Sequence, residues 1–154
     1  MREYIVPALF LFLCQSAPAG TVPAGWKTVK DSKGLCQIAV PPEFVPLGDN
    51  TGAAVFQDAT TAIAVVTSQA GQAYKPLPDS WQKLIDIPKD KMFENTVKRI
   101  FYQDKTSRGA EDQNAYSSSV PAKNGTCSCH IVFLPSVTEE TARKIALSLG
   151  PAAE

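Results

Sequence analysis

The residues best suited to chemistry stand together near the end of this 154-residue chain, in the run Cys127-Ser128-Cys129-His130. Two further cysteines, Cys14 and Cys36, lie far from this run in the sequence. Thiolate and imidazole ligands suit Zn²⁺ and Cu⁺, and two cysteines one residue apart could also work as a redox pair. The run therefore raises three hypotheses: a structural disulfide, a soft-metal site and a thiol-redox site.

Strand parity bears on all three hypotheses, because residues 126–134 have the apolar, β-branched composition of a strand. Residues two apart share a face, so Cys127 and Cys129 face one way and His130 the other. Cys36 shares the apolar face of a second expected strand, 35–40. We therefore predict a disulfide from Cys36 to either Cys127 or Cys129. A metal site with Cys127, Cys129 and His130 remains an alternative that would need a bulge in the strand.

The first nineteen residues have the order of features found in a cleavable export signal. A basic start at Arg2 precedes an apolar run, residues 4–13, and an Ala17-Pro18-Ala19 site of small residues. The apolar run is shorter than the roughly 20 residues of a membrane-spanning helix. We expect cleavage after Ala19, with Ala24 as a second option. Lipidation at Cys14 and a cytosolic protein with a buried N-terminal element are the competing interpretations.

Loss of the signal would leave residues 20–154, which we expect to form a single periplasmic or secreted domain with no membrane span. The signal would take Cys14 with it, so three cysteines would remain in a compartment that permits disulfides. Hydrophobic residues make up 44% of the chain, which is a globular composition. Net charge is zero, which gives no electrostatic footprint for nucleic acid.

The order of expected elements predicts an α+β domain. An antiparallel sheet of about six to seven strands should be covered by a mid-chain helix and a C-terminal helix. The mid-chain helix starts at Asp79-Ser80, and the C-terminal helix is capped by Thr138 and ended by Gly150-Pro151. A further short helix is expected over 91–97. The expected strands are 24–33, 35–40, 53–57, 61–67, 98–105, 112–120 and 126–134.

Three segments resemble the PsbP/Mog1-like fold and its secreted bacterial relatives. They are GWKTVKDSKGLCQIAVPPEF near the start, SWQKLI in mid-chain and CHIVFLPSVTEETARKIALSL near the end. The likeness is a pattern of elements that extends over residues 25–149. It implies a non-enzymatic binding or assembly module, with no catalytic residue and no cofactor. It does not identify the partner protein or small ligand.

Other polar and aromatic residues suggest weaker alternatives. Ser117-Ser118-Ser119 could supply a nucleophile with His130 as base, but no G-x-S-x-G elbow is present. Asn124-Gly125-Thr126 fits a hairpin turn and also a glycosylation sequon. Candidates for acid–base pairs are Asp86, Asp90, Glu94 and Asp104, and candidates for a ligand groove or for the core are Trp26, Trp81, Tyr74 and Tyr116. We therefore expect an exported, non-catalytic binding module, with a metal or thiol-redox protein using Cys127 and Cys129 as the alternative.

Overall fold

A computed structural model describes residues 22–48, 52–57, 59–108 and 111–153. The expected signal peptide and Cys14 lie outside these residues. The helices are α1 (Asp79–Leu84), the 3₁₀ turn η1 (Lys89–Lys91) and α2 (Glu139–Leu147). The strands are β1 (Lys27–Lys30), β2 (Cys36–Val40), β3 (Val45–Pro46), β4 (Gly52–Gln57), β5 (Ala59–Ala70), β6 (Met92–Asn95), β7 (Ile100–Arg108), β8 (Glu111–Ala122), β9 (Gly125–Phe133) and β10 (Gly150–Pro151).

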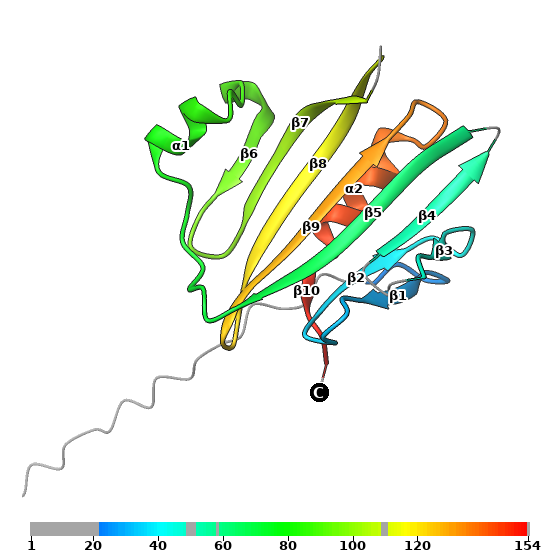
Figure 1. The fold of residues 1–154 in the computed structure, drawn as a ribbon, viewed down its shortest axis with the longest axis horizontal. Helices are drawn as coiled ribbons and strands as arrows, with labels where there is room; N and C mark the ends of the chain where they lie inside the picture. The colour runs from blue at the N-terminus through cyan, green and yellow to red at the C-terminus, as the bar shows by residue number, and fades with distance from the viewer. Residues whose placement is uncertain (1–21, 49–51, 58, 109–110, 154) are drawn as a thin grey trace, which may run out of the picture.

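Seven of the strands form one antiparallel sheet in the order β3-β4-β5-β9-β8-β7-β6 (Figure 1). β9 lies at its centre, paired with β5 on one side and with β8 on the other. Both edge strands are short, which limits the unpaired backbone that the sheet exposes. The predicted α+β class with a large antiparallel sheet is confirmed.

A second, three-stranded sheet has the order β1-β2-β10. Its third strand was not expected from the sequence, in which Gly150-Pro151 only marked the end of the last helix. Pro151 pairs with Cys36, and the Ala152 N–H donates to the Leu35 carbonyl at 2.9 Å. The chain therefore returns, after α2, to the strand that carries Cys36.

The core lies between the large sheet and a layer made of α2 and the small sheet. α2 packs on β8 and β9, and β2 packs on β5 and β9 (Figure 1). The inward residues of β9 alternate as parity predicts: Cys127, Cys129, Ile131 and Phe133 are all at most 4% exposed. The same face continues on β5 through Ala62, Ala64 and Val66. The central strand therefore presents both cysteines to the core.

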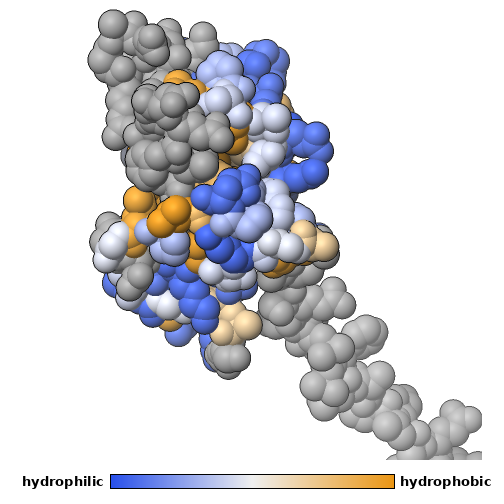
Figure 2. Space-filling view, turned by 90° about the vertical axis from the view of Figure 1, so that its right-hand side faces the viewer, coloured by the Kyte–Doolittle hydropathy of each residue, from blue (hydrophilic) through white to orange (hydrophobic). Residues whose placement is uncertain are grey.

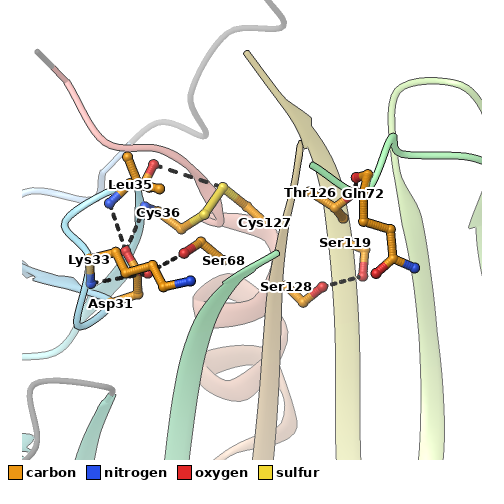
Figure 3. Close-up of a disulfide and its surroundings, with 10 residues drawn as sticks. All are labelled: Asp31, Lys33, Leu35, Cys36, Ser68, Gln72, Ser119, Thr126, Cys127 and Ser128. Carbon is orange, nitrogen blue, oxygen red and sulfur yellow. Dashed lines mark hydrogen bonds between the residues drawn. A yellow bond between two sulfur atoms is a disulfide. The ribbon is translucent and has the colours of Figure 1, made fainter. Parts of the chain in front are cut away.

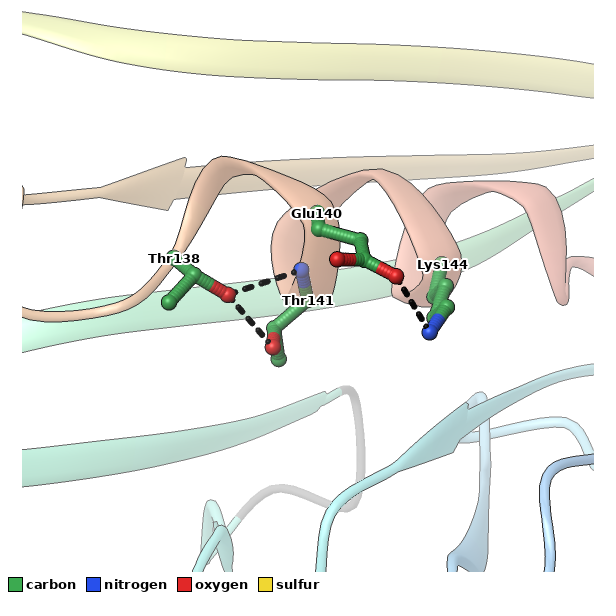
Figure 4. A network of polar contacts seen from close by, with 4 residues as sticks. All are labelled: Thr138, Glu140, Thr141 and Lys144. Carbon is green, nitrogen blue, oxygen red and sulfur yellow. Dashed lines mark hydrogen bonds and ion pairs between the residues drawn. The ribbon is translucent and has the colours of Figure 1, made fainter.

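The start of α2 is fixed by Thr138, as the sequence predicted (Figure 4). Its hydroxyl accepts a hydrogen bond from the Thr141 N–H at 3.2 Å, which satisfies one of the free N–H groups of the first turn. On the exposed side, Lys144 pairs with Glu140 at 2.7 Å and lowers the pKa of that carboxyl. The opposite side buries Ala142, Ile145 and Ala146.

The mid-chain region differs from the sequence prediction. α1 buries none of its residues, and Trp81 and Leu84 are 55% and 75% exposed. Asp86, with a φ of 50°, ends the helix in the left-handed conformation that glycine usually supplies. The short helix expected over 91–97 is instead η1 followed by the edge strand β6, because Met92, Glu94 and Asn95 pair with β7.

Seen from the side of β3 and β4, the described residues on this face are mostly hydrophilic, with a small group of hydrophobic residues between polar ones (Figure 2). None of the helices in the described part of the chain is both long and apolar enough to cross a membrane.

Candidate functional site

A disulfide joins Cys36 on β2 to Cys127 on β9 and ties the two sheets together (Figure 3). The two residues are 91 positions apart in sequence, their Cα atoms are 5.6 Å apart, and neither is exposed. This is one of the two pairings that strand parity allowed. The disulfide agrees with an oxidising compartment.

Asp31 holds the turn that leads into Cys36. Its carboxylate accepts hydrogen bonds from the N–H groups of Leu35 and Cys36 at 2.7 and 2.8 Å, and from the Ser68 hydroxyl at 2.5 Å (Figure 3). Burial alone would raise the pKa of Asp31, but these bonds and a longer one from the Lys33 N–H together lower it. The charged carboxylate therefore links the β1–β2 turn to β5, next to the disulfide.

Cys129 is the remaining cysteine of the described residues, and it is a buried thiol. Burial raises its pKa to about 12, and the nearby Arg99 only partly opposes that shift. The Arg99 guanidinium donates to the carbonyl groups of Leu147 and Leu149, at the end of α2, at 2.9 and 3.5 Å. A protonated, enclosed thiol is a poor nucleophile and a poor metal ligand. Cys129 is therefore a packing residue in this arrangement.

His130 lies on the opposite face of β9 from the cysteines, as parity predicted. Its Nδ1 is 2.8 Å from the Ser117 hydroxyl on β8. Burial lowers the pKa of His130, although Asp104 partly opposes the shift, so the neutral ring is favoured. Within the described ranges, no group of three or more histidine, cysteine or acidic residues could hold a metal ion. The structure thus does not bring Cys127, Cys129 and His130 together.

The Ser117–His130 pair has the residue types of a nucleophile and base, and both residues lie within strands of the large sheet. Ser117 lies within a central strand, in register with Tyr102 on one side and His130 on the other. The backbone N–H groups of such a strand point along the sheet toward its neighbours and not at the face. The N–H groups of β8 and of its partner strands are therefore not directed at the Ser117 hydroxyl. Ser119 makes a similar contact with Ser128, at 3.0 Å.

A pocket of about 460 Å³ opens beside the disulfide, and we call it the disulfide-end pocket. Its walls come from the β1–β2 turn, the end of β5, the β8–β9 hairpin and the C-terminal segment after β10. The lining residues are Gly34, Leu35, Cys36, Ser68, Gln69, Ala70, Ala122, Lys123, Asn124, Gly125, Thr126, Pro151, Ala152 and Ala153. Its volume lies within the range of about 300–1,000 Å³ that suits a small organic ligand.

Backbone contacts fix the walls of the disulfide-end pocket relative to one another. The Gly71 N–H donates to the Asn124 carbonyl at 2.8 Å, and the Thr126 hydroxyl donates to the Gln72 carbonyl at 3.0 Å. A Cβ atom at Gly125 would collide with the Gln69 carbonyl oxygen, so the hairpin approaches β5 through a glycine. The expected Asn-Gly hairpin turn is therefore also one wall of this pocket.

A second pocket, of about 490 Å³, lies between the end of α1 and strands β7 and β8. It is lined by Ile85, Asp86, Pro88, Lys91, Gln103, Asp104 and Asn114. Two of the four acidic residues singled out in the sequence, Asp86 and Asp104, share it, whereas Asp90 and Glu94 do not line it. Of the four candidate acid–base residues, Asp86 and Asp104 are therefore the two that line this pocket.

The four aromatic residues considered as a groove do not form one. Tyr116 is buried and stacks on Phe101 and Phe133, with centroid distances of 5.4 and 5.6 Å. Burial and the Glu139 carboxylate raise its pKa to about 12. Tyr74 donates to the Thr96 carbonyl, and Trp26 packs at the edge of the core. Trp81 was expected in the core and is instead exposed.

The disulfide-end pocket is the site that sequence reasoning missed. The Asn-Gly hairpin was visible as a turn signal, and the break between the expected strands 24–33 and 35–40 falls at the β1–β2 turn. Their proximity was not visible, because it depends on the pairing of β10 with β2 and on the stacking of two sheets.

Comparisons with known proteins show the fold and nothing more specific. No family model matches the chain, and no curated protein matches it. A crystal structure of a Bacteroides thetaiotaomicron protein is similar, with a TM-score of 0.55 and 12% sequence identity. The match covers 84% of this chain and 49% of that one, so the chain spans about half the length of its structural neighbour.

Proposed function

We propose that this chain is an exported binding module and that the disulfide-end pocket is its binding site. The observation that carries the proposal is a pocket of about 460 Å³ whose walls come from four separate segments. The disulfide, the Asp31 turn and the backbone bonds of Gly71 and Ala152 hold those segments together. A preformed site loses little conformational entropy on binding, which favours affinity.

The proposed location is periplasmic or secreted. The signal-like first nineteen residues and the Cys36–Cys127 disulfide support it independently. N-terminal sequencing of the exported protein should give Gly20 as the first residue. Recovery of the protein with Met1 intact would contradict export by cleavage after Ala19.

The proposal keeps the non-catalytic binding or assembly role implied by the PsbP/Mog1-like sequence pattern. That role is supported by the sequence resemblance alone, since no family model and no curated protein matches the chain. The arrangement of Cys127, Cys129 and His130 gives no specific support to the metal or thiol-redox alternative.

Occlusion of the pocket tests the binding function. Ala152 lines the pocket and contributes its backbone N–H to the Leu35 carbonyl, so Ala152→Phe would add a ring to the pocket and keep that bond. Small apolar probes, such as decanol, should bind the protein that begins at Gly20. We expect Ala152→Phe to weaken binding about tenfold or more, which corresponds to roughly 1.4 kcal/mol.

Ala73→Phe is the matched control, because Ala73 is exposed and does not line the pocket. Equal binding by the Ala152→Phe and Ala73→Phe variants would contradict the proposal. If Ala152→Phe fails to fold, Ala122→Phe fills another wall of the same pocket. Amide spectra of each variant would report on folding.

A further inference from the structure

Strand parity determines which lining residues direct their side chains into the disulfide-end pocket. Ser68 is in register with Cys127, whose side chain faces the core, so Ala70, two residues further along β5, shares that face. Gln69 and Thr126 are in register with each other and alternate with these residues. Their side chains lie on the opposite face of the sheet, as Figure 3 shows for Thr126 relative to Cys127. Their amide and hydroxyl groups are therefore directed away from the pocket.

The hydroxyl and the charged group that remain at the pocket already have partners. The Ser68 hydroxyl donates to the Asp31 carboxylate at 2.5 Å. Lys123, the one charged residue among those that line the pocket, is exposed and already interacts within the protein. Asn124 adds an uncharged amide at the exposed tip of the hairpin. Among the described residues, the lining therefore offers no free charge, and its other side chains are mainly apolar: Leu35, Ala70, Ala122, Pro151, Ala152 and Ala153.

We propose that the disulfide-end pocket selects uncharged ligands with an apolar chain, and that it discriminates against ligands of the same shape that carry a charge of either sign. The inference rests on the proposed function of that pocket. The apolar chain leaves water for contact with Leu35 and the alanine side chains, which is favourable. A charged group in the same place would lose its hydration and find no unpaired charge to replace it, which is costly.

Three short probes of equal chain length test this selection: hexanol, hexanoate and hexylammonium, which are neutral, anionic and cationic at pH 7. They are small relative to a pocket of about 460 Å³, so the polar end is also taken out of water. We expect hexanol to bind the protein that begins at Gly20 about tenfold or more tightly than either ion does. Titrations followed by amide spectra would measure the three affinities.

A charge introduced into the wall should change this preference. Ala122 lines the pocket, so Ala122→Lys should bind hexanoate about threefold or more tightly than Ala122→Gln, which adds similar bulk without charge. Ala73→Lys is the matched control for net charge, because Ala73 is exposed and does not line the pocket. If Ala122→Lys fails to fold, Ala153→Lys and Ala153→Gln make the same comparison at another wall.

Hexanol binding that is no tighter than that of either ion would overturn the inference, including the case in which none of the three binds. An equal gain in hexanoate affinity for Ala73→Lys would overturn it too, since net charge would then explain the effect. Decanol binding that Ala152→Phe weakens and Ala73→Phe does not would in either case still support the proposed function. Failure of that decanol test would reject the proposed function together with this inference.

Discussion

A buried carboxylate that accepts four hydrogen bonds makes Asp31 the residue with the clearest pH dependence. Its pKa is lower in the folded protein than the ordinary value of 3.8. The charged form therefore stabilises the fold above a pH of about 4, and this stabilisation is lost as the pH falls through the lower folded-state value.

Asp31→Asn should reduce the free energy of unfolding at neutral pH by about 1–3 kcal/mol, because the side chain then offers one acceptor oxygen to several donors. The difference from the unchanged protein should shrink below a pH of about 4. Denaturant unfolding at several pH values would measure this. A difference that stayed constant down to acid pH would contradict the account, and Ser68→Ala gives a milder version of the same test.

Cys129 should be inert in the folded protein. The protein that begins at Gly20 should show no reaction with iodoacetamide under native conditions and should be alkylated at Cys129 in guanidinium. The reasons are its 3% exposure and a pKa raised to about 12 by burial. Mass spectrometry after each treatment would check this. Rapid native alkylation of Cys129 would return the thiol-redox hypothesis to consideration.

At the scale of single residues, the sequence correctly predicted on which face of β9 the two cysteines and His130 lie. Alternation along residues 126–134 was enough to place both cysteines on one face and His130 on the other. It could not choose between Cys127 and Cys129 as the partner of Cys36, because both share that face. The choice depends on where β2 crosses β9, which is a property of the packed sheets.

Among the elements, α2 offers the most direct local test, which concerns the capping of its first turn by Thr138. Thr138→Ala removes the side-chain acceptor for the Thr141 N–H and should cost about 1 kcal/mol of stability, measured by denaturant unfolding. Thr138→Ser should restore most of the loss. Lys144→Ala is the control on the same helix, and it should have a smaller effect because its ion pair is exposed. A larger effect of Lys144→Ala than of Thr138→Ala would contradict the capping assignment.

The elements that were mispredicted share a physical cause. Met92, Phe93 and Val97 have helical spacing, but pairing with β7 places residues 92–95 in an edge strand. Gly150-Pro151 was expected to end the last helix, but α2 already ends at Leu147 with Ser148 as its C-cap, and Gly150-Pro151 pairs with β2. Both differences arise from backbone pairing. β6 pairs with the next strand in the chain, β7, whereas β10 pairs with β2, which is far away in sequence. Local propensity does not contain that information.

At the scale of the whole molecule, the Cys36–Cys127 disulfide should contribute several kcal/mol to stability, because it joins β2 to β9 across the two sheets. In the chain-entropy model, a closed loop of this length stabilises the fold by about 4–5 kcal/mol. The Cys36→Ala/Cys127→Ala variant should lose about 4 kcal/mol, measured by urea unfolding. Cys129→Ala, also at a buried cysteine, should lose less. Equal losses would contradict a role for the bond itself.

The overall class followed from the sequence, but the disulfide-end pocket did not. Strand-rich composition and a capped C-terminal helix were sufficient for an α+β prediction. The pocket is lined by Leu35, Gly125 and Ala152, which lie at three distant places in the chain and come together only in the folded protein. Residues of these types give no chemical signal in a sequence.

The most direct test of the central claim is to locate a bound apolar probe by intermolecular nuclear Overhauser effects in the protein that begins at Gly20. With decanol, we predict contacts to the methyl groups of Leu35, Ala122 and Ala152, which line the disulfide-end pocket. Contacts confined to exposed apolar residues elsewhere, such as Val45, Leu84 and Val97, would contradict the claim, as would the absence of any contact.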